Sequence, residues 1–442
     1  PNPSWQPADL SIRMKAHSPA AADRDVPGAT MLDDIPALLP ELRMLYEDLH
    51  RHPELSFAEV RTAGIMADRL RALGYEVTTG VGQTGVVATL DNGDGATVLL
   101  RGDIDALPVK EATGLAYAST AVGHDSDGKE VPVAHACGHD MHATWLIGVA
   151  TLLATHKDAW RGRVILAVQP AEEIGGGATA MIDDGLFERF GTPDVALGQH
   201  VAPAPAGWVL FRPGAVMTAS DALKIVMHGR GAHGSTPEQS VDPVVMAAAT
   251  VMKLQTVVAR NIAATESAVV TVGTLHVGTK ENIISDHAEL TLSVRTFEPA
   301  VRDKVLAAIS RIAHGEAHSC GAPQPPDITT LYSFPAVTND ADTTHTVGAA
   351  FVEHFGPERA MEGPVATASE DFGLFGARGG FPSMFWFVGG TDPELWQKAF
   401  AANRVNEDIP FNHSAQYAPV QDPTISTGIE AMLVAAMCWL KP

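Results

Sequence analysis

Three histidines and one cysteine stand close together in the segment from His135 to His142. The whole chain has only 3 cysteines, so a thiol in this company is unusual. A thiolate and neutral imidazoles are ligands that a borderline-soft divalent ion such as Zn²⁺ prefers. Cys137 and His139 flank Gly138, which permits the backbone turn that brings two side chains to one ion. An isolated cysteine is more often a small buried hydrophobe, so the prediction of a metal site depends on further ligands.

A pair of adjacent carboxylates, Glu172 and Glu173, follows the apolar segment 164–168 and Pro170. Adjacent residues of an extended chain point to opposite sides, so one glutamate can bind a metal while its neighbour reaches the attacking water. A bound ion lowers the pKa of water to about 7, and the second carboxylate passes the proton to the leaving nitrogen. The alternative is a solvated acidic turn. The apolar strand before the pair and the glycines 175–177 after it weigh against that alternative.

Further polar residues follow other short apolar segments. Asp103 and Asp105 share one face of an extended chain and could be a ligand pair, a turn, or a carboxylate that orients a ligand imidazole. His200 ends another predicted strand, and His413 lies in the segment 411–414. A lone histidine is usually not a ligand, so both histidines gain weight only together with the other residues.

The elements that must position these residues alternate between strands and helices. We predict helices over 31–50, 63–73, 141–156, 344–355 and 424–440, and strands over 76–78, 86–90, 97–100, 164–168, 194–198 and 384–388. This alternation, with polar residues just past strand ends, predicts an α/β fold. Its mixed, mostly parallel sheet would be flanked by helices and would carry the site at its carboxyl edge.

The sequence changes character near Gly214. Strands over 223–228, 268–277 and 288–296 and helices over 243–262 and 299–318 give a β-α-β-β-α order, which predicts an inserted α+β, ferredoxin-like small domain that ends at 323–326. We therefore expect an N-terminal arm over 1–30, a catalytic metal-binding domain over 31–213 and 327–442, and a small lid or dimerisation domain over 214–326.

Composition narrows the classes of partner. The chain has 30 basic and 52 acidic residues and a formal net charge of -22, which repels phosphate backbones and argues against nucleic acid. No segment approaches the roughly 18 apolar residues of a membrane span, and few, scattered cysteines argue against a disulfide framework. A cytoplasmic location is the simplest expectation. The chain begins with Pro1 rather than Met, so a removed leader and a periplasmic or secreted location stay open.

Five segments together resemble the dinuclear-metal amidohydrolases and metallopeptidases. That family includes hippurate hydrolases, N-acyl-amino-acid amidohydrolases and indole-acetyl-amino-acid hydrolases, with aminoacylase and glutamate-releasing carboxypeptidases as relatives. The resemblance runs from about Leu32 to the C-terminus and implies a zinc-peptidase-like catalytic domain. The segments are 49–57, 101–108, 136–142, 169–173 and 229–233.

The resemblance implies roles for particular residues of this chain. The implied metal ligands are Cys137, His139, Glu173, His200 and His413, with the Cys137 thiolate shared between two ions. Glu172 would be the general acid/base and Asp105 the carboxylate that orients a ligand. Asp103 stands where relatives in other branches place a histidine ligand, and this substitution fits the cysteine-using branch.

In the small domain, the resemblance implies residues that handle the substrate. His233 would polarise the scissile carbonyl, often in the partner subunit's site. Asn282 and Arg295 would contact substrate, and the bidentate fork of Arg295 suits a carboxylate. Two departures, Ser285 and Ala415 where the family commonly has proline, would alter loops without removing a ligand.

The predicted function is hydrolysis of the amide bond of hippurate-like N-acyl-amino acids to a carboxylic acid and a free amino acid. The expected cofactors are two divalent ions per subunit, of zinc, manganese, nickel or cobalt. The expected assembly is a homodimer or higher homo-oligomer, because a small domain with β-strands has an edge that can pair across a two-fold axis. Two alternatives remain: hydrolysis of a non-peptide amide, carbamate or ester at the same site, and a catalytically inactive metal-binding relative. The presence of Glu172 beside Glu173 argues against the inactive relative.

Overall fold

The computed structural model describes residues 29–125 and 127–441, which divide into two compact units. The first unit comprises the described residues up to Val216, together with Thr338–Pro364 and those from Asp371 onward. The second unit comprises Met217–Val337 and Val365–Glu370. The expected N-terminal arm lies outside the described residues except for its end, where helix α1 (Ala29–Leu32) begins. Within the described ranges, no helix combines the length and the apolar character that a membrane span requires.

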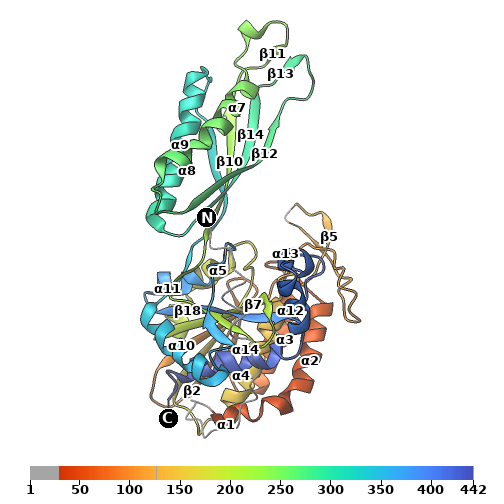
Figure 1. The fold of residues 1–442 in the computed structure, drawn as a ribbon, viewed down its shortest axis with the longest axis vertical. Coiled ribbons are helices and arrows are strands. Elements are labelled where there is room, and N and C mark those ends of the chain that lie inside the picture. The colour runs from red at the N-terminus through yellow and green to blue at the C-terminus, as the bar shows by residue number, and fades with distance from the viewer. Residues whose placement is uncertain (1–28, 126, 442) are drawn as a thin grey trace. The chain divides into compact units, whose positions relative to one another are not determined.

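An 8-stranded mixed sheet forms the centre of the first unit, in the order β1-β2-β6-β3-β7-β18-β8-β17 (Figure 1). The four central strands β6, β3, β7 and β18 run parallel to one another. The pairs β1–β2, β2–β6 and β18–β8 are antiparallel. The predicted mixed, mostly parallel sheet is confirmed. Its strands are β1 (Glu76–Val81), β2 (Gly85–Asn92), β3 (Thr97–Asp103), β6 (Gly162–Gln169), β7 (Val195–Pro205), β8 (Val209–Phe211), β17 (Ala360–Glu362) and β18 (Ser383–Thr391).

Helix α4 (His139–Thr155) is buried on nearly all sides. It packs against α2 (Ile35–Arg51), α14 (Thr424–Met437) and strands β3 and β7. A helix that is apolar all round belongs in a core, and these elements pack around α4. Its N-terminus, which carries His139, is therefore fixed in place. The remaining elements of the unit are α3 (Val60–Ala72), β4 (Val122–His124), β5 (Glu130–Pro132), α5 (Gly177–Asp183), α6 (Leu186–Phe190), α10 (Ala341–Phe355), α11 (Gly373–Gly379), α12 (Pro393–Ala401) and α13 (Val405–Asp408).

The second unit has a 4-stranded antiparallel sheet in the order β12-β14-β10-β15. Burial alternates along β14, so one face of the sheet is covered and the other is open. Figure 1 shows helices α7, α8 and α9 beside this sheet, and their apolar side chains form a core with those of the covered face. The elements are β10 (Ala219–His228), β11 (Ala232–His233), α7 (Pro243–Leu254), α8 (Thr256–Asn261), β12 (Ala268–Val277), β13 (Ile283–Ile284), β14 (His287–Thr296), α9 (Pro299–Ser319) and β15 (Asp327–Phe334).

Two details of the second unit differ from the sequence prediction. The single helix expected over 243–262 is interrupted at Gln255, which separates α7 from α8. The structural unit extends to Val337 rather than ending at 326, because β15 pairs with β10 at the edge of the sheet. Most residues of β15 are exposed, so the strand lacks the alternation of apolar residues that would have marked it in the sequence.

Candidate metal centre

The sequence-predicted ligands of the first unit lie together at one edge of the large sheet. Strands β3 and β6 are parallel and end at Asp103 and Gln169, and the residues after them reach Asp105 and Glu173. His200 lies on β7, which pairs parallel with β3. His139 opens α4, and the backbone N–H of His413 donates to Ala136 O at 2.7 Å.

The ligand atoms form two groups that share one residue. Cys137, His139 and His200 each place one ligand atom within 4.8 Å of the others. Cys137, Glu173 and His413 do the same. Cys137 Sγ lies 3.5 Å from His200 Nε2, and His413 Nε2 lies 3.3 Å from Glu173 Oε2. Because the Cys137 thiol belongs to both groups, its position suits a ligand that two ions share.

Hydrogen bonds on the outer side of two imidazoles leave their inner nitrogens available. His139 Nδ1 lies 3.1 Å from Asp105 Oδ1, and His200 Nδ1 lies 2.7 Å from the carbonyl oxygen of Val201. Such partners fix the tautomer in which Nε2 is unprotonated and free to bind a metal. The inner atoms His139 Nε2 and Glu173 Oε1 are 3.7 Å apart.

Those two inner atoms are buried and have no hydrogen-bond partner among the described residues. Buried polar atoms of native proteins are nearly always satisfied. A cation between His139 Nε2 and Glu173 Oε1 would satisfy both, so the donor set fits divalent metal ions.

The ionisation of the site also favours a cation. Burial raises the pKa of the Cys137 thiol well above its ordinary value, and the carboxylates of Glu173 and Glu172 raise it further. Burial likewise raises the pKa of Glu173. Without a cation these groups hold their protons, whereas a divalent ion displaces protons from its ligands. Metal binding at this centre should therefore release protons.

Glu172 lies beside the ligand groups, on the turn that follows β6. The residue is 5% exposed, and its Oε2 is 3.9 Å from His139 Nε2. The turn is closed by Gly176 and Gly177, whose backbone N–H groups donate to the carbonyl oxygen of Ala171. A Cβ atom at Gly177 would lie 1.6 Å from Pro170 O, so only glycine fits there.

Asp105 connects the imidazole of His139 to the loop that carries Glu172 and Glu173. Its Oδ1 faces His139, while its Oδ2 accepts hydrogen bonds from Ser56 Oγ at 2.7 Å and from the backbone N–H of Glu173 at 3.0 Å. One carboxylate thus orients both ligands. The sequence had singled out Asp105 but had not identified Ser56.

Asp103 is engaged in a fully buried ion pair. Its Oδ2 lies 2.9 Å from Arg101 Nη1, and its Oδ1 is hydrogen-bonded to His142 Nδ1. Burial alone would raise the pKa of Asp103, but Arg101 and the neighbouring histidines hold it well below its ordinary value. His142 Nε2 accepts from the backbone N–H of Val201 at 2.9 Å. Both ring nitrogens of His142 are therefore occupied, and we place His142 outside the ligand set.

The predicted substrate residues lie in the second unit. His233 on β11 pairs with Ile283, and Gly234 N donates to Asn282 O at 2.9 Å, so exposed His233 and Asn282 are neighbours. Arg295 lies near the opposite end of β14, where its Nη1 donates to Ser369 Oγ at 2.6 Å. Strands rise about 3.3 Å per residue, so the length of β14 separates Arg295 from this pair by on the order of 25 Å.

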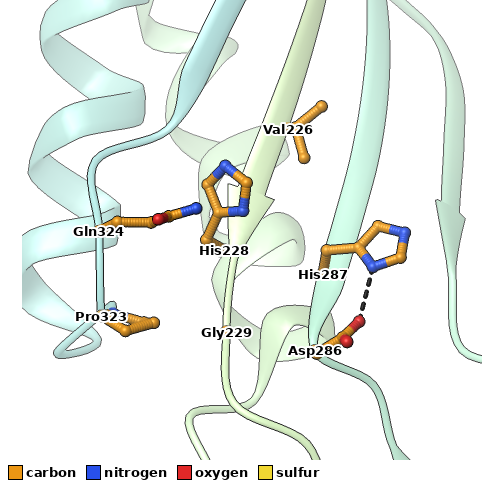
Figure 2. A pocket seen from close by; sticks show the side chains of 7 residues that line it. All are labelled: Val226, His228, Gly229, Asp286, His287, Pro323 and Gln324. Atoms are coloured by element: carbon orange, nitrogen blue, oxygen red, sulfur yellow. Dashed lines mark hydrogen bonds and ion pairs between the residues drawn. The ribbon is translucent and has the colours of Figure 1, made fainter.

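A cavity of about 400 Å³ also lies in the second unit, at one end of β10 and β14. Figure 2 shows the rings of His228 and His287 directed away from each other, with His287 paired to Asp286 at 2.6 Å. His228 is paired to Asp327 at 2.8 Å. The cavity thus has no converging ligand set like that of the first unit. Its lining is Val226, His228, Gly229, Asp286, His287, Pro323 and Gln324.

A thiol, imidazoles and carboxylates converge at one edge of a largely parallel sheet, and Glu172 lies beside them. This arrangement defines a metal-dependent hydrolase. Comparisons with known proteins agree. Residues 99–415 match the family described as peptidase family M20/M25/M40. The chain belongs to this family, and it is a metal-dependent amide hydrolase that binds divalent ions.

The names of individual relatives indicate the range of activities within this family. The chain is 37% identical to a hippurate hydrolase of Campylobacter jejuni over 352 residues, which are 78% of this chain and 87% of the relative. It is 34% identical to an N-acetyl-L-cysteine deacetylase of Bacillus subtilis over 350 residues, 79% of this chain and 80% of the relative. Among solved structures, the Bacillus subtilis YxeP protein, described as a dinuclear metal binding peptidase of the M20 family, has a TM-score of 0.71 at 28% identity. That alignment covers 91% of this chain and 98% of YxeP.

Proposed function

We propose that this chain hydrolyses the amide bond of N-acyl-amino acids to a carboxylic acid and a free amino acid. The observation that carries the proposal is the pair of ligand groups sharing Cys137, with Glu172 beside them. The similarity to a hippurate hydrolase and to an N-acetyl-L-cysteine deacetylase supports acylated amino acids as the substrate class.

Two divalent ions held by Cys137, His139, Glu173, His200 and His413 would polarise the scissile carbonyl and make water a stronger nucleophile. Glu172 accepts a proton from the attacking water as its oxygen bonds to the carbonyl carbon. Glu172 then gives that proton to the amide nitrogen as the carbon–nitrogen bond breaks. Asp105 keeps the His139 ring in the orientation and tautomer that a ligand needs.

His233 stabilises the developing oxyanion, Asn282 contacts the substrate, and Arg295 binds the free carboxylate. These roles require residues from two copies of the chain, because His233 and Arg295 are on the order of 25 Å apart within the second unit. We therefore propose a homodimer in which His233 and Asn282 serve the partner's site. Exposed apolar residues on α7, among them Val245 at 60% and Met252 at 72%, support a second copy as the partner of this unit.

The test of the reaction uses a panel of hippurate, N-acetyl amino acids, carbamates and esters with the wild-type chain and Glu172→Gln. We expect release of free amino acid by the wild type, a loss of about 10²- to 10⁴-fold in kcat for the variant, and unchanged metal content. Equal activity of the two chains contradicts the role of Glu172. Turnover of carbamates or esters alone favours the alternative of a carbamate or ester hydrolase. If no substrate of the panel is hydrolysed, the alternative of a catalytically inactive metal-binding protein is favoured.

The identity of the ions is tested by removing metal with a chelator and restoring zinc, manganese, cobalt or nickel one at a time, with magnesium and calcium as the comparison ions. A thiolate ligand favours softer ions such as zinc. We expect zinc to bind most tightly of the ions that restore activity. Restoration by magnesium or calcium would contradict a thiolate-containing centre.

A further inference from the structure

The segment from Leu49 to Glu59 joins α2 to α3, and its side chains contact three parts of the metal centre. His50 Nδ1 lies 2.6 Å from Asp140 Oδ2 at the start of α4. Ser56 Oγ donates to Asp105. Glu59 reaches the turn that carries the catalytic glutamates. The proposed reaction gives none of the residues in this segment a role.

Glu59 is a fully buried carboxylate, 0% exposed, at the end of this segment. A single oxygen, Oε1, accepts from the backbone N–H of Phe57 at 2.9 Å and from that of Ala171 at 2.8 Å. The other oxygen, Oε2, accepts from Thr84 Oγ1 at 2.5 Å. The carboxylate therefore ties the Leu49–Glu59 segment to a residue far along the chain.

Both residues bound by Oε1 have left-handed backbone conformations. Phe57 has φ 60° and Ala171 has φ 50°, a region that a residue with a Cβ atom rarely adopts. Ala171 immediately precedes Glu172, and its carbonyl oxygen accepts from Gly176 and Gly177. The backbone of Ala171 thus sets the direction in which the chain leaves for Glu172 and Glu173.

We propose that Glu59 is a positioning residue for the catalytic loop, which holds Ala171 in its left-handed conformation and thereby places Glu172 and Glu173. This role rests on the proposed function of Glu172. It extends the machinery of the reaction to a buried carboxylate that touches neither substrate nor metal. The rival explanation is that Glu59 contributes only to the stability of the fold.

The first experiment compares Glu59→Ala with Glu59→Gln. We expect Glu59→Ala to lower kcat about 10- to 100-fold with little change in KM, because a small misplacement of a catalytic group has effects of this size. Glu59→Gln should stay within about threefold of the wild type, because its amide oxygen can accept the same two N–H groups. Its NH₂ group can donate to Thr84, whose hydroxyl can turn to accept. Should Glu59→Ala fail to fold, Glu59→Asp, shorter by one methylene, should lower kcat in the same direction.

The decisive variant adds Ala171→Gly to Glu59→Ala. Glycine adopts the left-handed conformation without a Cβ penalty, so the double variant should recover most of the lost kcat. A merely structural role predicts that Glu59→Ala lowers the midpoint of thermal unfolding but leaves the kcat of the folded enzyme unchanged, so that Ala171→Gly has no kcat to restore. Failure of Ala171→Gly to restore kcat, or a wild-type kcat for Glu59→Ala, overturns the proposal.

Glu54→Ala is the matched control from the same segment. The carboxylate of Glu54 accepts from the backbone N–H groups of Arg61 and Thr62 at 2.9 and 2.8 Å, at the start of α3. It binds as many backbone donors as Glu59 Oε1 but none in the catalytic loop. We expect a lower midpoint of thermal unfolding and a wild-type kcat. A loss of kcat equal to that of Glu59→Ala would contradict a specific role for Glu59.

A titration with Zn²⁺ alone, in competition with a chromophoric chelator, separates this proposal from the proposed function. Because Glu173 lies on the same loop, Glu59→Ala should bind Zn²⁺ about tenfold more weakly, and Ala171→Gly should restore the affinity. If the wild type hydrolyses no acylated amino acid, the proposed function fails while this titration still decides the role of Glu59. Equal affinities of the wild type and Glu59→Ala overturn the positioning role.

Discussion

The two units hold their functional residues in opposite ways. In the first unit Cys137, His139 and Glu172 are buried, and His413 is the exposed member of the candidate ligand set. In the second unit His233 and Asn282 are exposed at the small two-stranded sheet of β11 and β13, with Ser235 as the polar neighbour of the His233 ring. The difference matches two tasks. Charged ligands must be fixed before a metal binds, whereas groups that meet the substrate must be free to approach it.

The largest expected effect comes from removing the thiol shared by the two ligand groups. Cys137→Ala should weaken metal binding by more than about 100-fold, since even residues behind the ligands typically contribute 10- to 100-fold. Hydrolysis should become undetectable at low micromolar metal. Metal content after dialysis and kcat for hippurate measure the effect. The distant cysteine variant Cys320→Ala is the control, and a Cys137→Ala chain that keeps two ions would refute the shared thiolate.

A smaller loss is expected from the exposed residue of the second unit. His233→Ala should lower kcat about 10²- to 10³-fold, the range seen when one oxyanion donor is removed. Metal content should not change, because His233 belongs to the other unit. Such a result, set against the metal loss of Cys137→Ala, would separate the candidate metal ligands from the proposed substrate residues. Loss of metal from His233→Ala would break it.

Mixing two inactive variants tests whether His233 acts across a dimer. Glu172→Gln and His233→Ala, allowed to exchange subunits, should regain activity at about a quarter of the sites. Half of the dimers are mixed, and each mixed dimer has one intact site. No recovery despite proven exchange would place His233 in the site of its own chain.

Replacement of Asp105, the carboxylate that orients His139, should lower the metal affinity by an intermediate amount. Asp105→Asn should weaken metal affinity about 10- to 100-fold, because a neutral amide orients and polarises an imidazole less well than a carboxylate. Zinc competition measures the affinity. Ser56→Ala removes only one donor to Asp105 and should change the affinity less than threefold or so. An equal or larger effect of Ser56→Ala would mean that Asp105 is held mainly through Ser56.

The same contrast explains how much the sequence could predict. The candidate site could be predicted where metal-binding residue types are close neighbours in the sequence. This holds for Cys137 with His139 and for Glu172 with Glu173, and the structure places these residues together. Strand β15 was missed because exposed edge residues show no apolar alternation. The link from Glu59 to Ala171 could not be predicted, because its donor is a backbone N–H and its geometry depends on a left-handed residue. Likewise, the separation of His233 from Arg295 follows from the pairing of β11 with β13, which one sequence does not specify.

The smallest effect concerns stability rather than catalysis. His50 is buried between Asp140 and Glu111, with ring nitrogens 2.6 and 3.1 Å from their carboxylates. Burial alone would lower the pKa of His50, but these carboxylates raise it to about 9. The folded chain thus keeps a proton that the unfolded chain releases near pH 6.5. This contribution is complete below about pH 6.5 and is lost as the pH rises through about 9.

Unfolding by urea at pH 6, 8 and 10 measures that loss. His50 should contribute up to about 3 kcal/mol at pH 6 that fades by pH 10, and His50→Gln should remove this part of the pH dependence. The control is His228→Gln in the second unit, whose contact with Asp327 is exposed to solvent and therefore weak. Equal pH profiles for the two variants would show that the buried charges around the metal centre are no more tightly coupled to folding than an exposed pair.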